Sequence, residues 1–280
     1  MQSSPATRPL NAALVHGVLA TYTVIALFPI VLVIVNAFKN RMGIFKSPLA
    51  PPTTETFSVE GFSKVLENAS FGLFFGNSLI VTVASMALIV LFGAMAAWAL
   101  TEYNFPGRRF LALFLAFGIM IPIKLGTVSI LELMVSLDLV NTRTALVLVY
   151  TAMGLPVAVL ILSEFMQQVP KELKEAARCD GVSEYRIFFQ IALPLVRPAL
   201  ATVAVFVMIP IWNDLWFPLI LAPAEDVQTV TLGVQQFVGQ YVTDWNSVLA
   251  ALSLAVVPVL ILYMLCARQI IRGLTSGAVK

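Results

Sequence analysis

Few charged side chains interrupt the long apolar stretches of this 280-residue chain, and Asp214 is the sharpest case. It is the only acidic residue between Pro198 and Ala224, and Trp212 and Asn213 directly precede it. An ionised carboxylate at membrane depth must face protein or water. An indole can stack on a sugar face while amide and carboxylate groups bond hydroxyls, so these three side chains could line a sugar pathway. The alternative is a structural Asp214 that pairs with a neighbouring subunit or caps an external helix.

Lys124 and His16 are the other isolated candidates. Lys124 follows Pro122 near one end of an apolar run, where a lysine commonly extends its ammonium group to the membrane surface. The functional alternative is that Lys124 attracts an anionic sugar carrying a carboxylate, phosphate or sulfonate. His16 is the single histidine, so the histidine cluster that a membrane-embedded hydrolase or a metal site would need is missing. We therefore expect neither enzymatic activity nor a metal site in this chain.

The composition is that of a polytopic membrane protein. Hydrophobic residues make up 59% of the chain, charged residues make up 11%, and the mean hydropathy is +0.92. This is far more apolar surface than one soluble core buries. The formal net charge of +2, without a basic tract, excludes nucleic acid as a partner. The sequence contains no glycine-rich phosphate cradle, so any ATP must be hydrolysed by another chain.

Six apolar stretches are long enough to cross a bilayer. We predict an all-α membrane protein with six transmembrane helices in a single domain over residues 1–280. The expected spans cover about 14–38, 71–100, 110–131, 144–163, 198–221 and 245–267. The first is too long for the apolar core of a signal peptide, so we expect it to be retained.

Lysine and arginine residues orient these spans. With the N-terminus inside, eleven of the seventeen lie on the cytoplasmic side, and the stretch between the fifth and sixth spans has none. Cytoplasmic loops of membrane proteins carry an excess of these residues. Both termini and the polar stretch 167–197 are therefore expected in the cytoplasm.

The stretch 167–197 is the only long charged interruption in the second half of the chain. Pro170 suits the first turn of a helix, and Gly181 suits the position just past its end. Lys174 is expected to turn away from the apolar stripe of that helix. The stripe consists of Val169, Leu173, Ala176 and Ala177.

A second short helix is predicted from an N-cap at Ser183 to Leu193, because proline disfavours helical geometry in the residue before it. One face of it should carry Tyr185, Phe188, Phe189 and Ala192. Two short helices with uncovered apolar faces either dock on a partner or lie on the membrane surface.

The spacing of residues in this stretch resembles the EAA signature, E-A-A-x3-G-x9-I-x-L-P, of binding-protein-dependent ABC importer permeases. The matching residues are Glu175, Ala176, Ala177, Gly181, Ile191, Leu193 and Pro194. The resemblance implies a type I ABC importer permease fold, in which this segment is a coupling helix pair seated in a cleft of a separate ATPase subunit. Glu175 would form a docking salt bridge or orient the loop. Leu193-Pro194 would end the segment and direct the chain back into the membrane.

Further segments narrow the resemblance to carbohydrate importers of the maltose type, and to the permease that resembles the G component of the maltose system. These segments are 137–142, 168–173, 212–214 and 272–280. In relatives, the short tail reaches toward the ATPase dimer interface. The resemblance implies the same role for Gly273, Thr275, Gly277 and Lys280.

As a whole, the resemblance implies the transmembrane permease subunit of a binding-protein-dependent ABC importer for a carbohydrate or sugar derivative, in the bacterial inner membrane. The implied partners are a cytoplasmic ATPase dimer, a second, non-identical permease and an extracytoplasmic solute-binding protein. This chain would bind no cofactor, since ATP and Mg belong to the ATPase. The alternative is an ion-coupled secondary sugar transporter. It would need several ionisable residues at mid-membrane, where only Asp214 and Lys124 come close.

Overall fold

The computed structural model describes the backbone of residues 7–67, 69–238 and 243–278, and the side chains of residues 13–67, 70–238 and 243–265. Within these ranges the secondary structure is helical, apart from two isolated β-bridges. Four helices are long and apolar enough to cross a membrane, or six spans if each of two bent helix pairs counts as one. The expected all-α membrane fold is confirmed.

The chain divides into two units, Met1–Ala69 with Val234–Val256, and Ser70–Gly233 with Val257–Lys280. The first unit contains α1 (Thr7–Ala37), α2 (Arg41–Lys46), α3 (Glu60–Glu67), a 3-10 turn at Val234–Phe237 and the first part of α14 (Trp245–Ala278). The second unit contains most of α4 (Ala69–Glu102), then α5 (Arg108–Met120), α6 (Thr127–Ser136), α7 (Arg143–Met166), α8 (Lys171–Cys179), α9 (Glu184–Arg186), α10 (Leu193–Leu195), α11 (Arg197–Trp212), α12 (Trp216–Leu221) and α13 (Val230–Gly233).

A buried lysine holds the first unit together. Lys39 is fully buried, and its Nζ donates hydrogen bonds to Asn36 Oδ1 at 3.0 Å and to the carbonyl oxygens of Ser47 at 2.8 Å and Pro48 at 3.2 Å. The side chain of Asn246 donates to the Lys39 carbonyl at 2.9 Å. Burial lowers the pKa of Lys39, because desolvation disfavours its charged form. These bonds join the end of α1 to the loop after α2 and to the start of α14.

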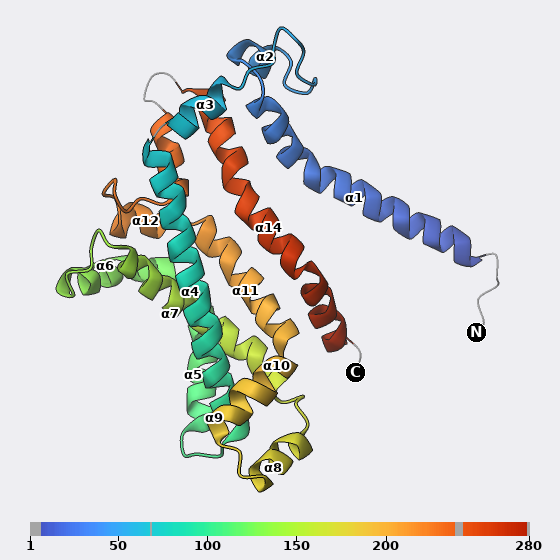
Figure 1. Cartoon of the computed structure of the whole chain (residues 1–280), viewed down its shortest axis with the longest axis vertical. Coiled ribbons are helices and arrows are strands. Elements are labelled where there is room, and N and C mark those ends of the chain that lie inside the picture. The colour runs from blue at the N-terminus through green and yellow to red at the C-terminus, as the bar shows by residue number, and fades with distance from the viewer. Residues whose placement is uncertain (1–6, 68, 239–242, 279–280) are drawn as a thin grey trace. The chain divides into compact units, whose positions relative to one another are not determined.

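The second unit is built around α7, which packs against both α5 and α11 (Figure 1). Two helix pairs in this unit are bent. α5 and the segment Ile123–Ser136 meet at 89°, and Pro122, which has no amide hydrogen to continue a helix, lies at the break. The segments Glu184–Leu195 and Arg197–Asn213 meet at 76°. The third predicted span, 110–131, is therefore not one straight helix.

Small residues set the distance between α4 and α7. A Cβ atom added at Gly93 would stand 2.8 Å from Ala158 Cβ, and one added at Gly154 would stand 2.4 Å from the tip of Ile89. Small residues at membrane helix interfaces let two backbones approach closely and gain van der Waals contact. The glycines thus allow a close approach of the two helices along which the core of the unit forms.

We expect Gly93→Ala to lower the thermal stability of the solubilised protein. The added methyl would clash with Ala158, and such overpacking costs about 1–3 kcal/mol against a gain of up to about 1 kcal/mol in helix propensity. Gly76→Ala on the same helix is the matched control, because no atom outside its own helical surroundings lies within 4 Å of the added carbon. A melting temperature for Gly93→Ala at or above that of Gly76→Ala would contradict the close packing.

Candidate functional site

A glycine forms the turn after α8. The helix ends at Cys179, and Gly181 adopts a left-handed φ of 75°. The Gly181 amide donates to the Arg178 carbonyl and the Val182 amide donates to the Ala177 carbonyl, each at 3.0 Å. This pair of bonds is a Schellman motif, which favours glycine at the residue with positive φ. The predicted position of Gly181, just past the helix end, is confirmed.

The buried face of α8 differs from the predicted apolar stripe. Lys174 is 6% exposed and Ala177 is 8% exposed, whereas Leu173 is 48% exposed and Glu175 and Ala176 are exposed too. Val169 is 5% exposed, so the predicted stripe is confirmed for Val169 and Ala177. It was wrong for Leu173, Ala176 and Lys174, because it assumed that a lysine faces water. An ammonium group can be buried when a carboxylate is buried with it.

Four charged residues and one tyrosine, here called the Glu102 cluster, join α8 to the end of α4. The Lys174 ammonium binds Glu102 Oε2, and Arg178 Nη2 donates to Glu102 Oε1 at 2.6 Å. Arg178 Nε also donates to Glu184 Oε1 at 2.7 Å, and Tyr103 Oη donates to Glu184 Oε2 at 2.8 Å. The Lys174 and Glu102 side chains are only 7% and 10% exposed. Figure 1 shows α8 and α9 gathered at this end of α4.

Aromatic rings and balanced charge support the Glu102 cluster. The Lys174 ammonium lies 5.4 Å from the centroid of the Trp98 ring, a favourable cation–π distance, and that ring lies 5.8 Å from the ring of Phe188. Hydrogen bonds to Glu184 and Glu102 raise the pKa of Arg178, so its guanidinium stays charged. Two cations and two anions therefore compensate each other where the apolar helix α4 ends.

Sequence reasoning did not identify Glu102 as a site residue, although two local signals pointed to it. Glu102 is the first charged residue after an uncharged run that begins at Asn68. Lys174 and Arg178 are four residues apart, so they lie on the same side of α8. The pairing itself joins residues 72 apart in the sequence, and no local pattern reports such a contact.

The aromatic residues that follow α8 are divided between two environments. Phe188 is 5% exposed and Ala192 is fully buried, whereas Tyr185 is 77% exposed and Phe189 is 48% exposed. The prediction of one shared face was wrong because Ile187–Ala192 is π-helical, and the wider turn of a π-helix rotates successive side chains differently from an α-helix.

The remaining signature residues lie where the chain turns toward α11. Ile191 and Leu193 are partly buried and pack against the core of the second unit. The helix does not end at Leu193, as predicted from the following proline, but continues to Leu195, with Pro194 in the first turn of α10. Core packing holds Leu193 in α-helical geometry, with φ of −60° and ψ of −45°, against the local preference.

The carboxylate of Asp214 accepts three hydrogen bonds. Tyr150 Oη donates to Oδ2 at 2.9 Å, the Phe217 amide donates to Oδ2 at 3.1 Å, and the Trp216 amide donates to Oδ1 at 3.3 Å. The two amides belong to the first turn of α12, so Asp214 caps that helix. Thr231 Oγ1 donates to the Asp214 carbonyl at 2.8 Å. The geometry matches the structural alternative that the sequence left open for Asp214.

A cavity of about 400 Å³ lies beside Asp214. Its polar lining comes from Lys124, Tyr150, Asn213 and Asp214, and the remaining walls are largely apolar. The Lys124 ammonium lies 5.7 Å from the centroid of the Trp216 ring. The structure therefore brings three of the four predicted pathway residues to one cavity.

Trp212, the fourth predicted pathway residue, does not line this cavity. It is 2% exposed, and its ring packs edge-to-face on Phe75 with a centroid distance of 5.7 Å. Asn213 Nδ2 donates to the Ile209 carbonyl at 2.9 Å.

The predicted C-terminal contact residues extend beyond the part of the chain whose side chains are described. The backbone of Gly273, Thr275 and Gly277 belongs to α14. Lys280 lies outside the described residues.

The family model for the binding-protein-dependent transport system inner membrane component matches residues 89–276, which is more than half of the chain. The chain belongs to this family. It is therefore a multi-pass inner membrane permease subunit of an ABC importer, and it is not itself an enzyme, because a separate subunit hydrolyses ATP. Membership of this family excludes the alternative function that the sequence left open, an ion-coupled secondary sugar transporter.

Named transport permeases and a solved ABC transporter structure resemble this permease along nearly its whole length. The diacetylchitobiose uptake system permease protein NgcG of Streptomyces coelicolor is 33% identical over 96% of this chain and 89% of its own. The arabinooligosaccharides transport system permease protein AraQ of Halalkalibacterium halodurans is 33% identical over 98% of both chains. A chain of a bacterial ABC transporter that imports the acidic polysaccharide alginate has the same fold, with a TM-score of 0.79, 20% identity and coverage of 96% and 99%.

We expect Glu102→Ala to detach α8 from α4 in this permease. The substitution leaves Lys174 buried without its carboxylate, and breaking a buried ion pair from one side costs about 3–5 kcal/mol. Amide hydrogen exchange over residues 171–179 should accelerate by about a hundredfold or more. Mass spectrometry of peptides from the exchanged protein measures this effect.

Asp180→Ala is the control for Glu102→Ala. Asp180 is an exposed carboxylate next to the same helix, and its side chain makes no hydrogen bond or ion pair within the described part of the chain. Equal exchange rates in the two variants would show that the Glu102 cluster does not hold α8.

Proposed function

We propose that this permease imports a carbohydrate or sugar derivative and that α8 couples it to a cytoplasmic ATPase. The observation that carries the proposal is the Glu102 cluster, which joins α8 to the end of α4 through a buried ion pair of Glu102 with Lys174 and a partly exposed one with Arg178. A helix held this firmly can transmit a displacement to the membrane helix behind it. The sugar class is supported by relatives whose names state diacetylchitobiose and arabinooligosaccharides, each 33% identical to this chain.

The exposed surface of residues 167–197, here called the coupling segment, supports docking on a partner. Leu173, Tyr185 and Phe189 are 48%, 77% and 48% exposed, and Glu175 and Ala176 are exposed beside them in sequence. Exposed apolar side chains rimmed by charge are typical of a protein interface. We infer that an ATPase subunit covers these residues, with Glu175 forming a salt bridge to it. Ala176 and Gly181 would permit a close approach.

This docking requires that α8 and both termini lie in the cytoplasm, as the distribution of Lys and Arg predicts. ATP and Mg would be bound by the ATPase dimer and not by this chain. A second, non-identical permease would complete the pathway, and an extracytoplasmic solute-binding protein would deliver the sugar. The tail with Gly273, Thr275, Gly277 and Lys280 would reach toward the ATPase dimer. Closure of that dimer would then tilt the spans as rigid bodies, so that the transport pathway opens alternately to the two sides of the membrane.

The cavity of about 400 Å³ beside Asp214 is the proposed sugar contact within this chain. Its volume lies within the range of about 300–1,000 Å³ that small-molecule sites occupy. Tyr150 and Asn213 offer hydroxyl and amide groups, and Lys124 would attract an anionic substituent. Asp214 would orient Tyr150 through their 2.9 Å hydrogen bond. Trp212 would reach the sugar only after its contact with Phe75 opens.

Glu175→Ala is expected to weaken retention of the ATPase by at least about tenfold, because it removes a charged partner from a docked surface. The chain would be tagged, solubilised gently and purified, and copurifying subunits would be quantified by mass spectrometry. Glu172→Ala, an exposed glutamate on the same helix, is the matched control. Equal ATPase retention in both variants would argue against docking through Glu175. The absence of any copurifying ATPase would argue against the proposed assembly.

Lys124→Met is expected to lower uptake of an anionic sugar by about tenfold while uptake of a neutral sugar changes little, since only the anion loses a charge-assisted bond. Uptake into vesicles that contain the assembled importer measures both. An equal effect on the two sugars, or no effect, would contradict a role for Lys124 in charge selection.

A further inference from the structure

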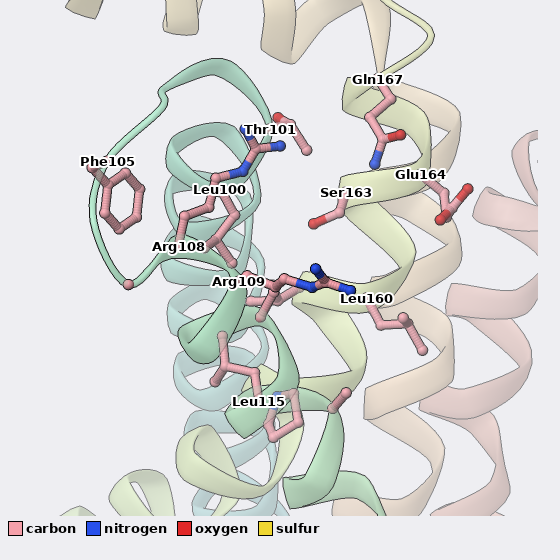
Figure 2. Close-up of a pocket in the computed structure, with 15 residues that line it drawn as sticks. Leu100, Thr101, Phe105, Arg108, Arg109, Leu115, Leu160, Ser163, Glu164 and Gln167 are labelled. Atoms are coloured by element: carbon pink, nitrogen blue, oxygen red, sulfur yellow. The ribbon is translucent and has the colours of Figure 1, made fainter.

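A cavity of about 630 Å³ lies between the start of α5 and the end of α7, closed on one side by the end of α4 (Figure 2). Its lining shares no residue with the cavity beside Asp214 or with the Glu102 cluster. The roles derived above assign no ligand to this space.

Two arginines concentrate positive charge at one end of the cavity. Arg108 Nη1 donates to Asn104 Oδ1 at 2.7 Å and to the Tyr103 carbonyl at 3.5 Å, whereas its Nε and Nη2 make no hydrogen bond within the described residues. Arg109 makes no hydrogen bond or ion pair with any residue in the described ranges, and in Figure 2 its side chain extends across the front of α7. Glu164 also lines the cavity, but it points away from α5 in this view. The net charge of the Arg108, Arg109 and Glu164 side chains is therefore +1.

The same end of the cavity offers polar groups, whereas the other end is apolar. Thr101, Ser163 and Gln167 lie near the arginines, at the ends of α4 and α7 (Figure 2). Deeper along the two helices, the walls consist of Ala112, Leu115, Ala116, Pro156 and Leu160. Since α5 begins and α7 ends at the charged side, the polar end lies at the edge of the membrane and the apolar end lies inside it.

We propose that this cavity binds an anionic glycerophospholipid such as phosphatidylglycerol. Arg108 and Arg109 hold the phosphate, because guanidinium groups bind phosphate oxygens with charge-assisted hydrogen bonds. The hydroxyl and amide groups of Ser163 and Gln167 bond the head-group hydroxyls, and one acyl chain follows the apolar walls between α5 and α7. Basic pockets between membrane helices are known to suit anionic lipid head groups.

The shape of the site favours a lipid over a soluble phosphate ester. A soluble ligand gains nothing from the apolar half of the cavity, whereas an acyl chain gains about 0.8 kcal/mol for each buried methylene group when its alternative is water. For a lipid already in the membrane, the acyl chain moves from the bilayer and not from water into the cavity. The arginines therefore determine which lipid head group is preferred, and the apolar walls determine how the lipid is oriented. The ligand is thus identified by a phosphate at one end and a hydrocarbon chain at the other.

Native mass spectrometry of the purified full-length permease with its copurifying subunits tests the site. Phosphatidylglycerol and phosphatidylcholine are each titrated into delipidated protein, and retained lipid is counted. We expect preferential retention of phosphatidylglycerol and a loss of affinity of about tenfold or more in Arg109→Ala. Arg197→Ala is the matched control, because Arg197 is an exposed arginine at the start of another membrane helix and does not line the cavity.

Two further measurements test whether the acyl chain occupies the apolar half of the cavity and whether a soluble phosphate ester can replace the lipid. Ala112→Phe fills the apolar half and should lower retention of phosphatidylglycerol without removing either arginine. Soluble glycerophosphoglycerol should fail to displace the lipid at equal concentration. Equal losses in Arg109→Ala and Arg197→Ala, equal retention of the two lipids, or displacement by the soluble ester would each overturn the proposal.

Discussion

The bond between the Glu102 carboxylate and two cations of α8 is the interaction on which the arrangement of α8 against α4 depends. Glu102 lies at the end of an apolar helix, where an unpaired carboxylate would be costly to bury. Lys174 and Arg178 meet both of its oxygens, and Arg178 passes the connection on to Glu184. Neither partner is stable in this position without the other, so the end of α4 and the helix α8 are held as one piece.

The orientation of α8 follows from this pairing. Because Lys174 and Ala177 face inward, Leu173, Glu175 and Ala176 are left on the outside, where a partner can reach them. The same constraint gives a path for movement. A displacement of α8 reaches α4 through the ion pairs, and α4 approaches α7 closely at Gly93. The signature residues and the membrane helices are therefore connected through charged groups outside the signature itself.

The two carboxylates that stand out in the apolar sequence, Glu102 and Asp214, are stabilised differently. Glu102 is paired with cations, whereas Asp214 accepts a tyrosine hydroxyl and two amides from the first turn of α12. Both solutions satisfy the rule that a charge at membrane depth must have partners. They have different consequences, because the ion pairs of Glu102 join two separate helices, whereas the bonds of Asp214 fix a local turn beside the cavity that Lys124 also lines.

The sequence by itself determined the features that local chemistry controls. Its hydropathy established a membrane protein, the spacing around Glu175 indicated the family, and the need for positive φ placed Gly181 just past the end of α8. Only the tertiary structure decided which face of α8 is buried, because that choice rests on a contact between residues 72 apart. It also decided the π-helical turn at Ile187–Ala192 and the capping role of Asp214. Periodicity reports the polarity of a side chain, but the partner that makes burial of a charge favourable comes from elsewhere in the chain.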